Sequence, residues 1–167
     1  MKSFRVLLIA GLALAGPHAA RAADAYPAGP IRLVVPFPAG GGTDILAREL
    51  ARELDQQWHQ PVIVENRPGA GGAIGAAAVA TAKPDGYTML MTTAGVSAIN
   101  PSLYKSLPYD PEKQFTPVSR VASTVFGVLV HPSLGVNSIG ELIALARSKP
   151  GMLTFGSAGN GAAGHLP

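Results

Sequence analysis

Residues 31–54 read IRLVVPFPAGGGTDILARELAREL, and this stretch determines the fold. The apolar run 31–35 predicts a buried β-strand, and the glycine-rich segment 36–44 predicts a loop. The leucines at 46, 50 and 54, with the alanines at 47 and 51 beside them, predict an amphipathic helix with this face on a sheet and charged residues such as Arg48 on the other side. A helix start carries backbone N–H groups without intrahelical partners and a partial positive charge. Because three glycines precede it, a carboxylate or phosphate can approach these N–H groups closely, and the stretch predicts an anion-binding turn.

A purely structural interpretation of the same glycines remains open, since tight strand-to-helix turns use glycine for positive φ. Thr43 is expected to be the N-cap of the helix. Asp44 is expected either to stabilise the helix start by its charge or to contact an ammonium or hydroxyl group of a ligand.

The composition, with 47% hydrophobic and 14% charged residues among 167, is that of a globular protein. The formal charge of +3 comes from Lys2, Arg5 and Arg21 at the N-terminus, because ten basic and ten acidic residues remain without them. Nucleic-acid binding therefore loses its main support. The absence of cysteine excludes disulfides and thiolate chemistry, and the scattered His59, His131 and His165 do not suggest a metal site.

Residues 1–22 have the pattern of a secretory signal peptide. Two basic residues precede an apolar run (6–15), a Gly-Pro breaker and the small-residue site Ala20-Arg21-Ala22. The alternative, a membrane anchor, is disfavoured because the run is shorter than the roughly 20 residues that span a bilayer. We expect cleavage near Ala22 and a periplasmic location.

Two further strand-to-helix units follow the first. Residues 61–65 predict a strand, 66–72 a glycine loop, 73–82 a helix, and 87–91 a third strand that ends in the polar loop 92–97. Strands alternating with helices predict an α/β fold with a parallel sheet, whose three loops gather at the carboxyl edge. The glycines at 69–72 lack the third glycine of the dinucleotide fingerprint, so a hinge or packing role is the more probable interpretation.

The last part of the chain predicts the start of a second lobe. Residues 118–122 and 125–130 predict strands, Ser138 to Glu141 is a capping box that opens a helix through Arg147, and 153–155 predict another strand. The loop 156–161 then repeats the glycine-rich pattern of the first loop. Two anion-binding edges are therefore expected to face one another across a cleft.

Five segments carry a resemblance to a known family. The motifs at 30–44, 64–72, 84–88, 100–104 and 107–110 together resemble the Bug-type substrate-binding proteins of tripartite tricarboxylate transporters, over the whole chain after residue 22. The resemblance implies a type II periplasmic-binding-protein fold, with a signal peptide (1–22), an incomplete first α/β lobe (23–122) and a truncated second lobe (123–167). It also implies a monomeric receptor without enzymatic activity, which captures a small organic acid between its lobes and delivers it to the membrane components of the transporter.

The resemblance also implies the binding residues. No catalytic residue, cofactor or metal is implied. The residues expected at the ligand are those of the first loop, of the third loop and of the second glycine loop: Phe37, Ala39, Gly40, Gly41, Thr43, Asp44, Thr93, Gly95, Ser97, Ser157, Gly159, Asn160, Gly161 and His165.

Two alternatives remain open. Family members continue after a His-Leu pair, whereas here His165-Leu166 is followed by Pro167 alone, so the chain is alternatively a nonfunctional fragment of a receptor. Residues 23–167 would then be unstable or prone to aggregation and would not bind ligand. The other alternative is a secreted α/β hydrolytic enzyme, which would need a base near Thr93 or Ser97.

Overall fold

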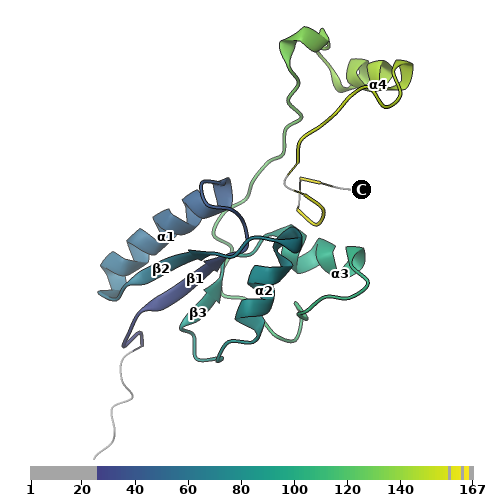
Figure 1. The fold of residues 1–167 in the computed structure, drawn as a ribbon. Coiled ribbons are helices and arrows are strands. Elements are labelled where there is room, and N and C mark those ends of the chain that lie inside the picture. Colours follow the sequence, from purple (N-terminus) through teal and green to yellow (C-terminus); the bar gives the residue numbers. More distant parts are fainter. Residues whose placement is uncertain (1–25, 158, 163, 166–167) are drawn as a thin grey trace, which may run out of the picture.

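The computed structural model describes residues 26–157, 159–162 and 164–165. The predicted signal peptide and its cleavage site lie outside the described residues. Three parallel strands, β1 (Ile31–Val35), β2 (Val62–Asn66) and β3 (Thr88–Leu90), form a sheet in the order β2-β1-β3 (Figure 1). The prediction of a parallel α/β sheet is confirmed. β1 lies in the middle, and its four apolar residues are buried, because a central parallel strand is covered on both faces. Its second residue, Arg32, is exposed and pairs with Glu65 (3.2 Å).

Helix α1 (Gly42–Trp58) covers one face of the sheet. Ala47 packs in a core that includes Leu33 and Val35, and Ala51 is buried one turn further along the helix. The prediction that Leu46 lies on this face is wrong, since 36% of it is exposed. The rest of the predicted face does lie on the sheet, since the half-buried Leu50 packs against the same core, and the small Ala47 allows the helix to approach the sheet closely.

Helix α2 (Ala73–Ala80) packs on the other face, after the 3-10 turn η1 (Ala70–Gly72). A Cβ at Gly75 would lie 2.8 Å from Pro36 Cα, so only glycine permits this contact between the helix and the end of β1. A Cβ at Gly72, where φ is +92°, would lie 2.6 Å from the Val96 side chain. The packing role predicted for the glycines of this second unit is therefore confirmed.

The polypeptide after β3 packs against α2, on the same face of the sheet. It contains the π-helix η2 (Gly95–Ile99), α3 (Asn100–Leu103) and a proline-rich loop that carries the buried Tyr109. The Tyr109 hydroxyl donates to the Val96 carbonyl (2.6 Å) and the Asn100 amide donates to the Tyr109 hydroxyl (3.2 Å). These bonds hold the loop against the third strand-to-helix connection.

Helix α4 (Ile139–Ser148) stands away from the sheet, joined to it by extended segments on both sides (Figure 1). The 3-10 turn η3 (Pro132–Leu134) precedes it. The first half of the predicted capping box is present, because Ser138 Oγ accepts from Glu141 N (3.2 Å). Glu141 Oε2 accepts from Asn137 N (2.7 Å), one residue before the cap, instead of from Ser138 N.

The strands predicted at 118–122, 125–130 and 153–155 are wrong. These segments are largely extended but pair with no strand among the described residues, and most of their side chains are exposed. A strand persists only when a neighbouring strand satisfies its N–H and C=O groups. The sequence pattern indicates that these residues prefer an extended backbone, but it does not indicate whether a neighbouring strand is present to pair with them.

Within the described ranges, no helix combines the length and the apolar character that crossing a membrane requires.

Candidate functional site

The loop between β1 and α1 presents the helix start to its surroundings. Gly41 is the N-cap, with an extended backbone (φ −75°, ψ 163°) and no side-chain cap, and its carbonyl accepts from Ile45 N (3.0 Å). The backbone N–H groups of Gly42, Thr43 and Asp44 therefore have no carbonyl partner within the helix. The prediction that Thr43 is the N-cap is wrong, because the helix already begins at Gly42 and Thr43 is its second residue.

The glycines of this loop border open space. A Cβ at Gly40 or Gly42 would meet nothing within 4 Å, and one at Gly41 would meet only the Pro38 carbonyl at 3.5 Å, an ordinary contact. Of the three, only Gly40 has a positive φ (+82°). Neither packing nor backbone conformation therefore requires glycine at 41 and 42, and their lack of a side chain leaves the helix start accessible.

Asp44 lies beneath the loop rather than on its outer surface. Only 2% of it is exposed, and its carboxylate accepts from Gly40 N (2.8 Å), Arg48 Nε (2.9 Å) and Asn66 Nδ2 (2.9 Å). The Arg48 guanidinium, then the Gly40 N–H and the Asn66 amide, lower the pKa of the Asp44 carboxyl to about 2. Asp44 is therefore ionised at any physiological pH, and the structure gives it partners within the protein.

The first two of the three loops meet at the carboxyl edge of the sheet, as predicted. Asn66 Nδ2 donates to the Phe37 carbonyl (3.1 Å), which joins the end of β2 to the first loop. The half-buried Phe37 ring packs against both cores. Ala39, by contrast, is exposed on the loop.

The segment after the third loop is joined to the second loop by Asn100 at the start of α3, whose amide donates to the Gly71 carbonyl (3.1 Å). Gly95 is buried in η2, and Ser97 is exposed. The Thr93 hydroxyl oxygen is buried and has no hydrogen-bond partner among the described residues. Ser97 Oγ is hydrogen-bonded to Thr92 Oγ1 (2.8 Å), so its recorded partner is a second hydroxyl and not the base that a hydrolytic enzyme would need.

The second glycine loop forms a turn of its own. Ser157 Oγ accepts from Gly159 N (3.2 Å) and is hydrogen-bonded to His165 Nδ1 (2.6 Å). The His165 ring stacks on Phe155, with 5.7 Å between the ring centres. Gly159 and Gly161 both have positive φ, which a turn of this shape requires.

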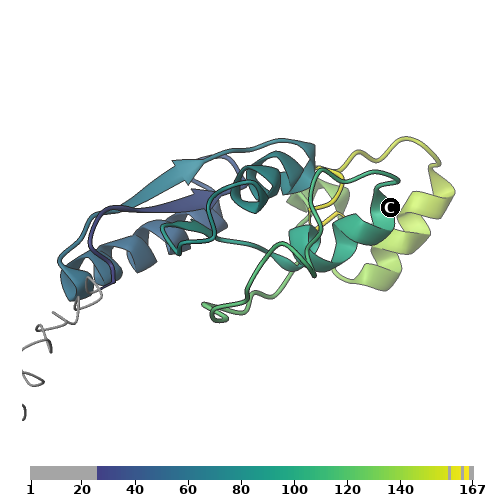
Figure 2. The ribbon, with the colours of Figure 1, turned by 90° about the horizontal axis from the view of Figure 1, so that it is seen from below.

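The second glycine loop (156–161) lies near α2 and α3, as both ribbon views show (Figures 1 and 2). The Tyr104 hydroxyl donates to the Asn160 carbonyl (3.0 Å), and the buried Gly161 lies against the Asn100 side chain. A Cβ at Gly71 would collide with the Asn160 carbonyl, and one at Gly161 with the Asn100 side-chain oxygen. The recorded contacts of the second loop thus run to Gly71, Asn100 and Tyr104 rather than to the helix start at Gly41.

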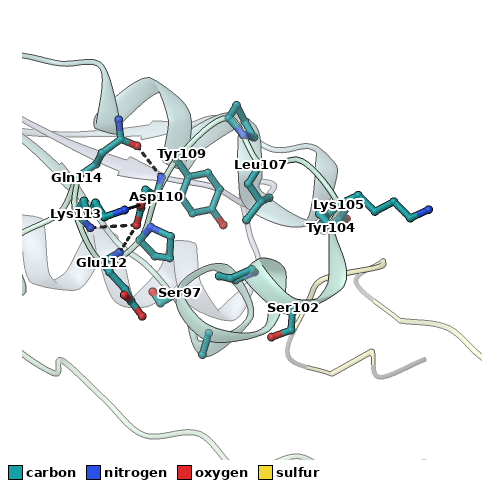
Figure 3. Close-up of a pocket in the computed structure, with 14 residues that line it drawn as sticks. Ser97, Ser102, Tyr104, Lys105, Leu107, Tyr109, Asp110, Glu112, Lys113 and Gln114 are labelled. Atoms are coloured by element: carbon teal, nitrogen blue, oxygen red, sulfur yellow. Dashed lines mark hydrogen bonds and ion pairs between the residues drawn. The ribbon is translucent and has the colours of Figure 1, made fainter.

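A separate open hollow of about 1130 Å³ lies along the segment after η2 (Figure 3). Its floor includes Tyr109, and Lys113 pairs with Asp110 (3.1 Å) at its rim. Ser97 is the one predicted site residue that lines it. The hollow is therefore a feature distinct from the helix start. Among the described residues, no three His, Asp or Glu side chains come together as metal ligands would.

Sequence reasoning missed four residues that organise the site: Arg48, Asn66, Asn100 and Tyr104. The spacing of Arg48 along the helix predicts a place on the solvent face, and 53% of its side chain is indeed exposed. Asn66 directly follows the predicted strand, and a polar residue at that place was the one available signal, because it must lie at the carboxyl edge of the sheet.

Thr43 at the start of α1 and Ser138 at the start of α4 allow a direct test of capping. Thr43→Ala is expected to change the free energy of unfolding by less than about 0.5 kcal/mol, because no cap is removed. Ser138→Ala is expected to destabilise α4 by about 1 kcal/mol, because it removes the bond to Glu141 N. Amide hydrogen exchange within α1 and α4 measures the change in stability that each substitution causes. A loss of protection in α1 that equals the loss in α4 would contradict the assignment of Gly41 as the cap.

Comparison with known proteins gives a consistent result. The sequence profile of the tripartite tricarboxylate transporter family receptor matches residues 46–167. Protein BugT of Bordetella pertussis is 41% identical over 169 residues, which cover 99% of this chain and 52% of BugT. A protein encoded in the gbd 5′ region of Cupriavidus necator is 40% identical over 157 residues, which cover 94% of this chain and 47% of that protein. The chain spans about half the length of the curated relatives it matches.

Solved structures agree with these sequence relatives. The R. palustris protein Rpa4515 with adipate superimposes with a TM-score of 0.71 at 36% identity, over 82% of this chain and 46% of that one. The periplasmic binding protein BugD gives a TM-score of 0.69 at 39% identity, over 83% of this chain and 46% of BugD. MatC from Rhodopseudomonas palustris with bound malate gives a TM-score of 0.54 at 41% identity, over 56% of this chain and 32% of MatC. The predicted periplasmic-binding-protein fold is thus confirmed over the part of those proteins that this chain covers.

Proposed function

The chain belongs to the tripartite tricarboxylate transporter receptor family, and we propose that it is a periplasmic solute receptor that binds a small organic acid at the start of α1. The observation that carries this proposal is the open glycine edge at 40–42. It offers unpaired N–H groups at the positive end of a seventeen-residue helix, in a place where no packing contact calls for glycine.

The chemistry of the helix start favours a carboxylate over other ligands. Its donors are backbone N–H groups and the Thr43 hydroxyl, and the neighbouring acidic side chain, Asp44, is held beneath the loop. A site of this kind holds an anion through backbone and hydroxyl donors. Two structural neighbours, Rpa4515 with adipate and MatC with bound malate, support a dicarboxylate as the ligand class.

The rest of the proposal concerns the whole receptor. We assign residues 23–122 to the first lobe and 123–167 to the second, with Thr93, Gly95 and Ser97 at the border of the cleft. Ser157, Gly159, Asn160, Gly161 and His165 form the opposing wall. The receptor acts as a monomer without a cofactor, is exported with cleavage near Ala22, and delivers its ligand to the membrane components of a tripartite transporter. Intact-mass analysis of the periplasmic protein tests the cleavage, and a product that retains Lys2 contradicts it.

A thermal melt tests the receptor function directly. Residues 23–167 are heated with and without adipate, and then with malate, while circular dichroism records unfolding. A ligand that binds only the folded chain raises the midpoint by mass action, so a cooperative transition that moves upward with concentration is the expected result. The neutral diamide of adipic acid is the matched control, because it keeps the carbon chain and removes both charges.

A second candidate is that these residues alone form no working receptor. The exposed apolar side chains in 118–155 favour it, since Val125, Leu129 and Phe155 are 97%, 94% and 80% exposed. In the same melt, a cooperative transition that neither dicarboxylate shifts supports this second candidate and contradicts the first.

A further inference from the structure

Three side chains form a closed hydrogen-bonded ring beneath the first loop. Arg48 donates from Nε to Asp44 Oδ2 (2.9 Å) and from Nη2 to Asn66 Oδ1 (3.0 Å), and Asn66 donates from Nδ2 to Asp44 Oδ1 (2.9 Å). We call these three residues the Asp44 ring. It joins two turns of α1 to the end of β2, and it occupies both polar atoms of the Asn66 side chain.

The ring is fixed to the loop at two backbone atoms. Gly40 N donates to Asp44 Oδ2 (2.8 Å), and Asn66 Nδ2 donates to the Phe37 carbonyl (3.1 Å). These two bonds bracket Pro38 and Ala39. With both ends held, the path of the chain into α1 is defined, and so is the direction in which the N–H groups of Gly42 and Thr43 point.

We propose that Arg48 and Asn66 are positioning residues for carboxylate binding, acting through Asp44 on the shape of the loop 37–41. This inference rests on the proposed function of the helix start. Neither residue needs to touch the ligand, since Asn66 contacts the loop from within and Arg48 reaches it only through the ring.

The ring also explains how an anion site tolerates an aspartate at its base. The positively charged group that faces the Asp44 carboxylate is Arg48, and the other two donors, Gly40 N and Asn66 Nδ2, are neutral. Asp44 therefore engages the N–H of Gly40 and the charge of Arg48, while the N–H groups of Gly42 and Thr43 stay available.

Arginine is needed for this geometry because one planar guanidinium donates in two directions. A lysine keeps the charge but cannot bond Asp44 and Asn66 through the same rigid fork. The substitution Arg48→Lys thus removes the hydrogen-bonded ring and keeps the positive charge, so it distinguishes the effect of the ring from the effect of the charge.

The test measures adipate affinity by calorimetry in Arg48→Lys and Asn66→Ala, with Arg52→Lys as the matched control. Arg52 lies one turn further along α1 and pairs with Glu49 and Glu53 at the surface. Arg48 has a half-exposed side chain, so its variant is expected to fold. We expect both ring variants to weaken adipate binding roughly tenfold, and Arg52→Lys to leave it unchanged.

Two further readouts distinguish positioning from a general loss of stability. Hydrogen exchange at the Gly40 amide is expected to speed up in Asn66→Ala, while exchange in the β1 core stays slow. In acid, the native pKa of Asp44, about 2 against an ordinary 3.8, means that the ring stabilises the fold fully above about pH 4 and ceases to do so as pH falls through about 2. The difference in unfolding midpoint between the wild type and Asp44→Asn should therefore shrink over that interval.

Failure of this inference and failure of the proposed function give different results. A folded wild-type chain that binds no adipate contradicts the proposed function. A wild-type chain that binds adipate with an affinity that Arg48→Lys and Asn66→Ala leave unchanged overturns the Asp44 ring as a positioning device.

Discussion

Gly41→Val is expected to weaken dicarboxylate binding by at least about 2 kcal/mol, roughly a 30-fold rise in Kd. The added isopropyl group stands in front of the start of α1, where the ligand must approach the N–H groups of Gly42 and Thr43. The substitution does not strain the fold, because Gly41 has an extended backbone with φ −75° and room for a Cβ 3.5 Å from the Pro38 carbonyl. Calorimetry with adipate measures the loss.

Gly29→Val is the matched control for this experiment. Gly29 also has open space around its Cβ position, but it precedes β1 at the opposite edge of the sheet. Its variant should bind as the wild type does. Unchanged affinity in a folded Gly41→Val protein excludes the helix start as the site.

Purified residues 23–167 are expected to self-associate, and the double substitution Val125→Lys with Leu129→Lys to shift them strongly toward monomer. The segment 118–130 is extended, carries one charge and exposes valine, leucine and phenylalanine side chains, a combination that recruits other chains. Burying one such side chain contributes about 1.5–3 kcal/mol, so a few of them suffice to hold two chains together.

Light scattering after gel filtration at several protein concentrations measures this association. The control, Ile45→Lys with Ile74→Lys, adds the same two charges at exposed isoleucines on α1 and α2. We expect the control to associate as the wild type does. A wild type that is monomeric at all concentrations, or a control that dissociates equally, would show that this segment is not the cause.

The first sheet could be predicted from the sequence because its signals are local. The apolar run of β1, the glycine turn and the periodicity of α1 each lie within a few residues, and the structure reproduces them. The exception within α1 is instructive. Periodicity favours both Leu46 and Ala47 as residues of the buried face, but only Ala47 is buried, because the closeness of a helix to a sheet depends on the size of the facing side chains and not only on their polarity.

The contacts that shape the candidate site could not be predicted, because they depend on register. Asn66 is paired with Val35, the last residue of β1, and this places its amide beside the Phe37 carbonyl. A shift of one residue would turn Asn66 to the other face of the sheet. No pattern in the sequence fixes that register, and so the Asp44 ring is visible only in three dimensions. The failed strands at 118–130 have the same cause, since pairing requires a partner that local preference does not specify.

The opposed glycines at 71 and 161 have a consequence for exchange of sequence between relatives. Gly71 faces the Asn160 carbonyl, and Gly161 faces the Asn100 side chain, so a methyl group at either position pushes the loop 156–161 away from the surface on which it docks. The two positions therefore behave as one inherited unit, although the extended segment 118–130 separates them in the chain. A recombination event that joins two parents within 118–130 divides this unit. Such a hybrid retains the contact only where both parents contribute glycine, whereas a crossover outside 71–161 transmits the pair intact.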